Sequence, residues 1–300
     1  MYSVAKILFI KALTPLHVGT GRGEGAHVDL PIQRDEFGYP TIWASSLKGA
    51  IKAHIGKNNK VREYLGSEPG VSPTRPSHIS LLDARLVLMP VRVLEGVWAY
   101  GTTPHLLNYL KYYLDVYNEI SLKQSASSKL ELRLDLIKSM KRKGLSNKFK
   151  DLVIINETDL EIEYIDDLIS KMGIDKIFPS DIRDKILEQG LVILSDENNI
   201  GLNILNKSLL IQYRVRLKGE EKTVEEGPWS EEYLPMETVF VSLILCRDYK
   251  SDGSSKSGVE ICDEFKKEID KKTIYVGGRE TIGRGLAKLY VLKRSYGDMN

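Results

Sequence analysis

Two glycine-rich segments with interleaved arginines stand near the ends of the sequence, GTGRGEG at 19–25 and GGRETIGRG at 277–285. Glycine lets backbone N–H groups approach a phosphate, and arginine adds positive charge. Neither segment is a P-loop, because the Gly-Lys-Ser/Thr ending is missing. One such loop is as often a tight turn, but two together favour a phosphate-rich polymer as ligand. The candidate binding residues are Gly19, Gly21, Arg22, Gly277, Gly278, Arg279, Gly283, Arg284 and Gly285.

A carboxylate, Asp29, follows the first glycine-rich segment and precedes Leu30-Pro31. Beside a phosphate-binding loop, a carboxylate can position a 2′-hydroxyl, accept its proton or hold a divalent metal ion. The alternative is a turn-stabilising aspartate, which the spacing alone favours. His17, at the end of the first expected strand, is likewise either functional or structural, and lone histidines are more often structural.

The segment WASSLKGAIKAHI (43–55) predicts a helix with Ser45 or Ser46 as its N-cap. Lys48 then lies in the first helical turn, where the helix dipole and the ammonium group both attract a phosphate. An exposed surface lysine is the alternative.

The sequence predicts a long β-hairpin over about 209–235. Polarity alternates over 209–217, and a KGEEK turn and the segment TVEEGPWSEEYLP follow. Glu231, Glu232 and Tyr233 stand at its foot and are candidates for lining the same cleft as Asp29. Trp229 and Tyr213 can stack on bases, although hairpin aromatics more often pack across strands.

These candidates need a scaffold, and the remaining pattern predicts an α+β fold. Strands are expected at 3–13, 81–94 and 236–246, with a strand, a glycine-rich loop and a strand at the end of the chain. The stretch from about 105 to 190 is expected to be mostly helical and inserted into this strand-rich chain.

The composition is that of a globular protein: 300 residues, 42% hydrophobic, with a formal net charge of only +2. Nucleic-acid binding must therefore come from local clusters of lysine and arginine. Cys246 and Cys262 have no close-spaced partner, which favours a reducing cytoplasm over a disulfide scaffold. No stretch has the length of a transmembrane helix, so no membrane partner is expected.

The segment TPLHVGTGRGEGAHVDLPIQRDEFGYPTIWASSLKGAIKAHI resembles the N-terminal signature of the RAMP superfamily. Within that superfamily, D-x-P-I-Q-R and S-S-L-K-G are most similar to the backbone nuclease subunits of type III-B CRISPR (Cmr) complexes. RVRLKGEEKTVEEGPWSEEYLPMETVF resembles their thumb hairpin, and GGRETIGRG resembles the C-terminal glycine-rich loop. The hairpin departs from the family pattern at Pro228-Trp229-Ser230.

The resemblance implies one domain over 1–300, with a ferredoxin-like (RRM-like) palm, a helical insertion and a β-hairpin thumb. It implies copies assembled head to tail in a helical filament along a CRISPR RNA, with other Cmr subunits and a target single-stranded RNA as partners. The target is then cut at regular intervals by 2′-hydroxyl attack, which leaves 2′,3′-cyclic phosphate and 5′-hydroxyl ends. Asp29 falls on the catalytic aspartate, with Mg or Mn as a transient cofactor. His17 falls on the loop histidine, Lys48 on the RNA-binding lysine, and Glu231, Glu232 and Tyr233 on supporting positions.

Three other functions fit the same resemblance. The chain could be the equivalent backbone subunit of the type III-A (Csm) complex, which is usually shorter. It could be a guide-binding structural subunit in which Asp29 is inert. It could also be an endonuclease that processes CRISPR transcripts with His17 as general base. Several copies per guide distinguish a backbone subunit from a processing enzyme.

Overall fold

The computed structural model describes residues 2–23, 28–57, 59–67, 70, 72, 74–122, 129–138, 140, 143–251 and 254–292. Strands β15-β16-β1-β12-β4 lie side by side in a twelve-stranded sheet, and each neighbouring pair is antiparallel. Their bounds are β1 Val4–Ala12, β4 Ala84–Val93, β12 Val239–Cys246, β15 Thr273–Tyr275 and β16 Leu286–Val291. Two short strands pair at the side, β2 (Thr41–Ile42) with β4 and β3 (Ile79–Leu81) with β12.

Both faces of β1 and β12 are buried, which explains why these two strands read as nearly continuous apolar runs. Along β1, Leu8 and Ile10 point into one core and Ile7 and Phe9 into the other, as expected from the period of two. Helices α1 (Ala44–Ile55) and α8 (Gly258–Ile269) cover the first face.

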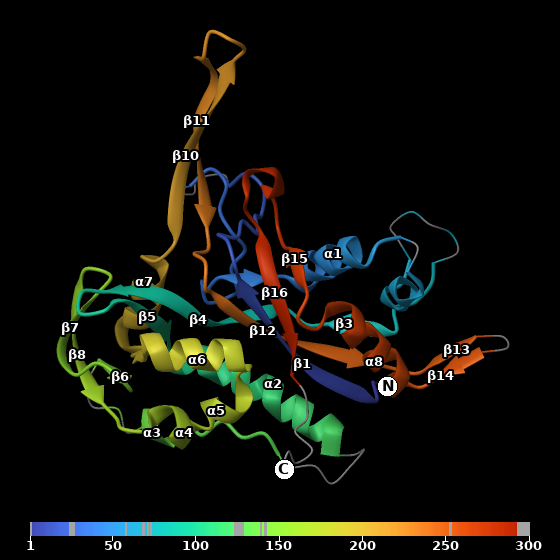
Figure 1. Cartoon of the computed structure of the whole chain (residues 1–300), viewed down its shortest axis with the longest axis horizontal. Coiled ribbons are helices and arrows are strands. Elements are labelled where there is room, and N and C mark those ends of the chain that lie inside the picture. The colour runs from blue at the N-terminus through green and yellow to red at the C-terminus, as the bar shows by residue number, and fades with distance from the viewer. Residues whose placement is uncertain are drawn as a thin grey trace.

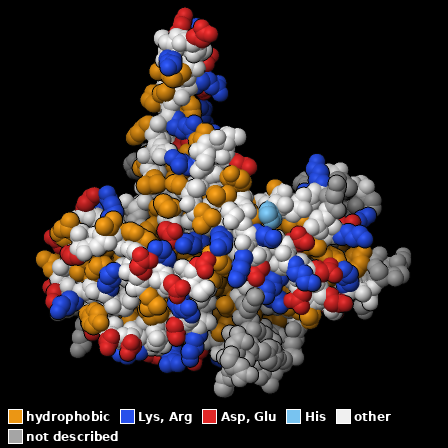
Figure 2. Space-filling view, in the orientation of Figure 1, with side chains coloured by type: hydrophobic (Ala, Val, Ile, Leu, Met, Phe, Trp, Pro, Cys, Tyr) orange, Lys and Arg blue, Asp and Glu red, His pale blue; other side chains and the backbone are white. Residues whose placement is uncertain are grey.

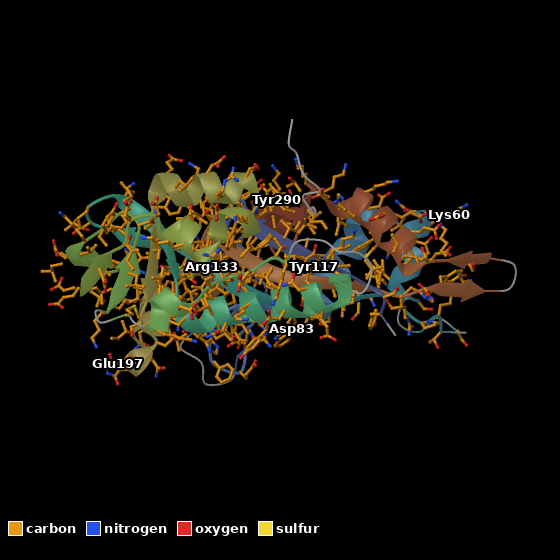
Figure 3. All side chains as sticks on the ribbon, turned by 90° about the horizontal axis from the view of Figure 1, so that it is seen from below. Lys60, Asp83, Tyr117, Arg133, Glu197 and Tyr290 are labelled. Carbon is orange, nitrogen blue, oxygen red and sulfur yellow. A yellow bond between two sulfur atoms is a disulfide. The ribbon has the colours of Figure 1, made fainter. Side chains whose placement is uncertain are left out.

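The second face is covered by α2 (Pro104–Leu122) together with α4 (Leu168–Met172), α5 (Ile174–Ile177) and α6 (Ser180–Gln189). Seen from below, α2 crosses the underside of the central strands, with Tyr117 on the helix and Asp83 beside it (Figure 3). The Tyr113 hydroxyl of α2 donates a 2.7 Å hydrogen bond to the Asp83 carbonyl and so fixes the helix to the sheet.

Beyond β4 the sheet closes on itself. The order continues β4-β5-β9-β6-β8-β7, and β7 pairs back to β4 through Val93 and Ile155. Pro90 lies inside β4 without breaking it, because β4 pairs with β12 only through Arg85–Leu88 and with β5 from Met89 onward. The strands of this ring are β5 Val97–Thr102, β6 Gly144–Ser146, β7 Asp151–Ile155, β8 Thr158–Tyr164 and β9 Leu191–Leu194.

The prediction of a mostly helical stretch over about 105–190 is therefore wrong for its middle part. Leu160 and Ile162 are buried while Asp159 and Glu161 face outward, and this alternation belongs to a strand. Asn156 and Glu157 both have positive φ, as in the tight turn of a hairpin between β7 and β8. The helices before and after this part are present, together with the short α3 (Asp135–Lys138).

The predicted long hairpin is confirmed. Strands β10 (Leu210–Lys218) and β11 (Thr223–Tyr233) form a two-stranded sheet of their own and project from the body (Figure 1). Ile211, Tyr213, Val215, Leu217 and Val224 are exposed apolar residues along it, and orange side chains are visible over its length in Figure 2.

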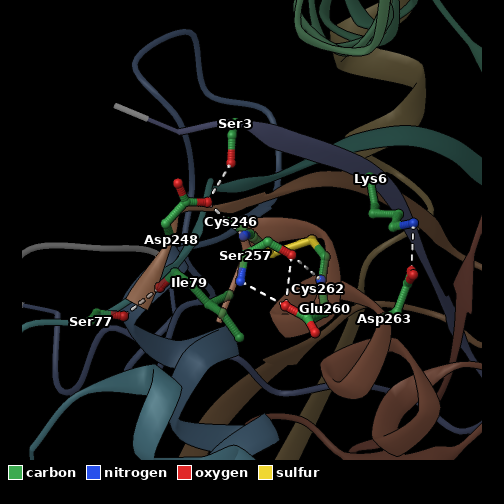
Figure 4. Close-up of a disulfide and its surroundings, with 11 residues drawn as sticks. Ser3, Lys6, Ser77, Ile79, Cys246, Asp248, Ser257, Glu260, Cys262 and Asp263 are labelled. Atoms are coloured by element: carbon green, nitrogen blue, oxygen red, sulfur yellow. Dashed lines mark hydrogen bonds and ion pairs between the residues drawn. A yellow bond between two sulfur atoms is a disulfide. The ribbon is translucent and has the colours of Figure 1, made fainter. Parts of the chain in front are cut away.

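The expectation that the cysteines are unpaired is also wrong. Cys246, at the end of β12, and Cys262, in α8, form a disulfide with a Cα–Cα distance of 5.8 Å (Figure 4). Helix α8 was missed in the sequence, so nothing indicated that it brings Cys262 back onto β12. Close by, Ser257 and Glu260 form a capping box at the start of α8.

The remaining elements are short: η1 Lys60–Leu65, η2 Glu197–Asn199, α7 Ile200–Asn206, β13 Tyr249–Ser251, β14 Ser254–Lys256 and η3 Glu280–Ile282. Within the described part of the chain, no helix combines the length and the apolar character that crossing a bilayer requires.

Candidate active site

Asp29 lies against the base of the hairpin. The chain at Leu30 adds to β11 as a short parallel bridge, with Leu30 N–H donating to the Ser230 carbonyl at 3.0 Å and Glu232 N–H donating to the Leu30 carbonyl at 3.1 Å. The Asp29 side chain accepts hydrogen bonds at Oδ2 from the N–H and the hydroxyl of Ser230, both at 2.7 Å. Neither of these bonds uses Oδ1.

An open cavity of about 220 Å³ lies in front of this carboxylate. The charges around it are mostly positive, because three arginines accompany Asp29 and Glu226. Hydrogen bonds from the Ser230 N–H and hydroxyl, supported by the charge of Arg22, hold the pKa of Asp29 below its usual 3.8. Asp29 is thus an exposed, ionised carboxylate. The cavity is lined by Arg22, Asp29, Leu30, Arg216, Glu226, Trp229 and Arg279.

Behind the cavity, Glu231 is fully buried. Its Oε1 accepts from Trp229 Nε1 at 2.7 Å and pairs with the Arg279 guanidinium at 2.6 Å. Its Oε2 accepts from the Tyr233 hydroxyl and lies 3.5 Å from Arg214. Burial alone would raise the pKa of Glu231, but the two hydrogen bonds and two guanidinium charges outweigh it and leave the pKa lowered. Glu231 therefore ties the hairpin to the C-terminal glycine-rich loop as an ionised group.

Glu232 points to the opposite side of β11. Its Oε1 pairs with Arg34 at 2.6 Å, and its Oε2 accepts from the Ile32 N–H at 3.1 Å. His17 Nδ1 lies 2.7 Å from the Glu232 carbonyl, so this nitrogen carries the proton in that hydrogen bond. His17 is 8% exposed and its ring stands 5.4 Å from that of Tyr233. Glu232 and His17 thus hold β11, the strand that carries Ser230, and both lie behind the cavity.

The two glycine-rich loops meet at His17. Gly278 N–H donates to the His17 carbonyl at 2.9 Å. A Cβ on Gly277 would lie 2.3 Å from that carbonyl oxygen, and one on Gly19 would lie 2.6 Å from His17 Nε2. Bulkier residues cannot approach this closely, so Gly19 and Gly277 serve backbone packing around His17.

Other parts of these loops are open. Gly21 and Gly283 have φ of +94° and +75°, with no atom near the position of a Cβ. Gly285 also has a positive φ, and its N–H donates to the Pro15 carbonyl at 3.0 Å. Arg284 turns inward: its NH2 donates to Gln212 Oε1 at 3.2 Å, and its guanidinium lies over the Tyr233 ring.

Helix α1 begins differently from the prediction. Its N-cap position is Trp43, and neither predicted serine caps it. Side chains from other segments accept the first N–H groups instead: Gln33 Oε1 accepts from Trp43 and Asp83 Oδ1 from Ala44, both at 2.8 Å. The Ser46 hydroxyl accepts from Gln33 Nε2 at 2.9 Å.

Gln33 also donates to the Gly19 carbonyl at 3.3 Å, so one buried amide joins the first glycine-rich loop to α1. Ser45 and Lys48 lie on this helix outside the cavity of Asp29. The site thus has two regions: the cavity at the foot of the hairpin, and the start of α1 with the glycine-rich loops.

Four important residues were missed in the sequence. Arg214 and Arg216 alternate along β10 and share the face that turns toward the cavity, and this period of two was a usable signal. Ser230 and Gln33 act through contacts with distant segments, which no local pattern indicates.

A divalent metal ion needs oxygen donors here. Among the described residues, no three His, Cys, Asp or Glu side chains stand close enough together to hold one. Asp29 Oδ1 would supply a single carboxylate donor. This fits the common way in which proteins bind Mg²⁺, through one or two carboxylates together with substrate phosphates.

Comparison with known proteins places this geometry in a family. The model of the RAMP superfamily matches residues 9–288. The chain is 37% identical, over 96% of both chains, to "CRISPR system CMR subunit Cmr4" of Saccharolobus solfataricus (strain ATCC 35092 / DSM 1617 / JCM 11322 / P2). It is 32% identical, over 95% of both chains, to "CRISPR system Cmr endoribonuclease Cmr4" of Pyrococcus furiosus (strain ATCC 43587 / DSM 3638 / JCM 8422 / Vc1).

Among solved structures, a chain of the type III-B Cmr-beta complex bound to cognate target RNA superposes with a TM-score of 0.76 at 33% identity, over 97% of this chain and 98% of that one. The family match and the mixed α+β fold thus define a RAMP protein. The chain belongs to the RAMP superfamily and, within it, to the Cmr4 family.

Proposed function

We propose that the chain is an endoribonuclease subunit of a type III-B CRISPR complex that cleaves guide-complementary RNA. One observation carries this proposal: an ionised, exposed carboxylate stands in a cavity with three arginines. Arginine attracts the phosphates of an RNA backbone, and RNA brings its own nucleophile, the 2′-hydroxyl. The name of the P. furiosus relative includes endoribonuclease, and the Cmr-beta structure contains target RNA.

In this mechanism the 2′-hydroxyl oxygen attacks the adjacent phosphorus and the 5′-oxygen leaves. The products are a 2′,3′-cyclic phosphate and a 5′-hydroxyl end. Asp29 Oδ1 orients the 2′-hydroxyl or accepts its proton. The hydrogen bonds from Ser230 lower the pKa of Asp29 and so keep it ionised. Arg22, Arg216 and Arg279 stabilise the charge that develops on the phosphate.

The other predicted residues have supporting parts in the proposal. Glu231, Glu232, Tyr233 and His17 hold the foot of the hairpin in place behind Asp29. Lys48, Ser45 and Ser46 bind RNA backbone at the start of α1, together with the open backbone at Gly21 and Gly283. We propose Mg²⁺ or Mn²⁺ as a cofactor that Asp29 would hold jointly with RNA phosphate. When bound, such an ion neutralises charge on the phosphate.

We also propose that the central strands form the ferredoxin-like palm of a single domain over 1–300. The support is the connection β1-α1-β4, then β12-α8-β16, which follows the β-α-β-β-α-β motif. The hairpin is the thumb of this palm, and the other five strands of the closed ring are inserted in the sequence between β4 and β12.

The proposed partners are a CRISPR RNA, a target RNA, other Cmr subunits and further copies of the chain, all in the cytoplasm. A hairpin that projects from one side favours head-to-tail contacts, which propagate as an open helix.

The test is cleavage by a reconstituted complex that carries Asp29→Asn or Asp29→Ala. Both variants should bind guide and target RNA as the wild type does and lose target cleavage. The matched control is Asp159→Asn, at an exposed aspartate on β8. Wild-type cleavage by the Asp29 variants would contradict the catalytic role and leave a guide-binding structural subunit as the function.

A further inference from the structure

Ser230 makes three hydrogen bonds to one residue that lies 201 positions away in the sequence. Its backbone N–H and its hydroxyl both donate to Asp29 Oδ2 at 2.7 Å. Its Oγ in turn accepts from the Asp29 N–H at 2.9 Å. The pattern is closed, because the hydroxyl donates once and accepts once, and each bond has good length.

The rest of the structure makes Ser230 a rigid anchor. It is 5% exposed and pairs in register with Tyr213 across the hairpin. Its carbonyl accepts from the Leu30 N–H, so the backbone on both sides of the Asp29 carboxylate is fixed to β11.

Asp29, by contrast, is exposed, so burial against other side chains does not select one rotamer for it. An unrestrained carboxylate at the surface samples several rotamers. The bonds to Oδ2 remove this freedom and leave Oδ1 as the oxygen available to a ligand in the cavity. Arg22, Arg216, Arg279 and Glu226 are the other charged groups that face this space.

We infer that Ser230 is the positioning residue of the cleavage site, which holds the Asp29 carboxylate in one orientation so that Oδ1 meets the RNA. This inference rests on the proposed function and adds a residue to it. Among the described residues the Ser230 hydroxyl bonds to Asp29, and Ser230 is not part of the cavity lining, so it acts through Asp29 and not on RNA.

The chemistry of the position allows a test with two side chains of equal shape. Threonine keeps a hydroxyl where serine has one, and valine replaces that hydroxyl with a methyl group. Any crowding from the added methyl is therefore common to Ser230→Thr and Ser230→Val. Ser230→Ala is the third variant and removes the hydroxyl without adding bulk.

The expected results are measured in single-turnover cleavage at saturating reconstituted complex, with target affinity measured separately. Ser230→Thr should cut within about threefold of wild type. Ser230→Val and Ser230→Ala should cut roughly 10- to 100-fold more slowly, the range for a misplaced reacting group, with target affinity unchanged. Ser242→Ala is the control, since it removes a buried serine hydroxyl bond to Leu82 far along β12.

A second measurement separates positioning from folding. If Ser230 acts through Asp29, the double variant Asp29→Ala/Ser230→Ala should cut no more slowly than Asp29→Ala alone. Equal rates for the Thr and Val variants, or an additive loss in the double variant, would overturn the inference. Wild-type cleavage by Asp29→Ala would instead remove the proposed function, so the two failures are distinguishable.

Discussion

Arg279 and Glu231 form a 2.6 Å ion pair that joins the C-terminal glycine-rich loop to the foot of the hairpin. The Glu231 side chain is fully buried, whereas that of Arg279 is 35% exposed and also lines the cavity of Asp29. The Arg279 guanidinium thus contacts a buried carboxylate on one side and faces the cavity that we assign to RNA on the other.

This pair predicts a loss of stability in acid. The pKa of Glu231 in the folded protein lies below its ordinary 4.5, so its contribution to stability is present above pH 4.5 and is lost as the pH falls through the lowered value. Glu231→Gln should therefore be less stable than wild type at pH 7. The difference should shrink as the pH is lowered below about 4.5.

Urea unfolding of both proteins at a series of pH values measures this difference. Glu225→Gln, at an exposed position on the same strand, is the control for the effect of the substitution itself. A constant difference at every pH would mean that the pKa of Glu231 is the same in the folded and the unfolded protein.

Lys48→Ala should weaken binding to RNAs of unrelated sequence by a similar factor. If the ammonium contacts one phosphate, the slope of log K against log salt should fall by about 0.7, the value for single strands. Filter binding at several salt concentrations gives the slope. Lys185→Ala, on α6 and paired with Glu188, is the control. If Lys48→Ala left the slope of log K against log salt unchanged and weakened binding to one target sequence only, a phosphate contact would be excluded.

Reduction of the disulfide should destabilise the fold without affecting RNA cleavage. The bond closes a loop with a sequence separation of 16, for which chain entropy gives about 3 kcal/mol. Cys246→Ser/Cys262→Ser and dithiothreitol-treated wild type should show the same loss in the free energy of unfolding. A loss in the reduced protein that the double variant does not share would point to another cause.

Head-to-tail assembly predicts a ladder of cuts. Each copy covers the same number of nucleotides, so cleavage products of an end-labelled target should differ by a constant length. Shortening the guide by one such interval should remove one product and leave the others in place. A single cut, or irregular spacing, would favour an enzyme that processes CRISPR transcripts.

The parts of this structure that local patterns specify were predictable. The hairpin follows from alternating polarity on both sides of a Gly-Glu-Glu turn, and β12 follows from an apolar run. Asp29 was singled out because it follows a glycine-rich loop in a segment that resembles a known family. Strand β8 was mistaken for helix because its acidic residues were not weighed against the period of two set by Leu160 and Ile162.

The contacts that complete the site depend on segments distant in sequence. Ser230 reaches Asp29, Gln33 reaches Gly19 and Trp43, and Cys262 reaches Cys246 only after the sheet and α8 have formed. No spacing in the chain encodes these pairs. The start of α1 shows the same effect, because Gln33 and Asp83 replace the serine cap that local sequence favours.

The return of β7 to β4 has a further consequence if copies of the chain stand in a row, as we propose. An unpaired strand edge invites a neighbouring chain to add to the sheet, and such addition leads to aggregates. Because six strands close on themselves, the main path of described strands has one free end, the three-residue β15. Short edges accept new strands poorly. Crowded copies therefore find little exposed backbone edge on the main path of this sheet through which to join.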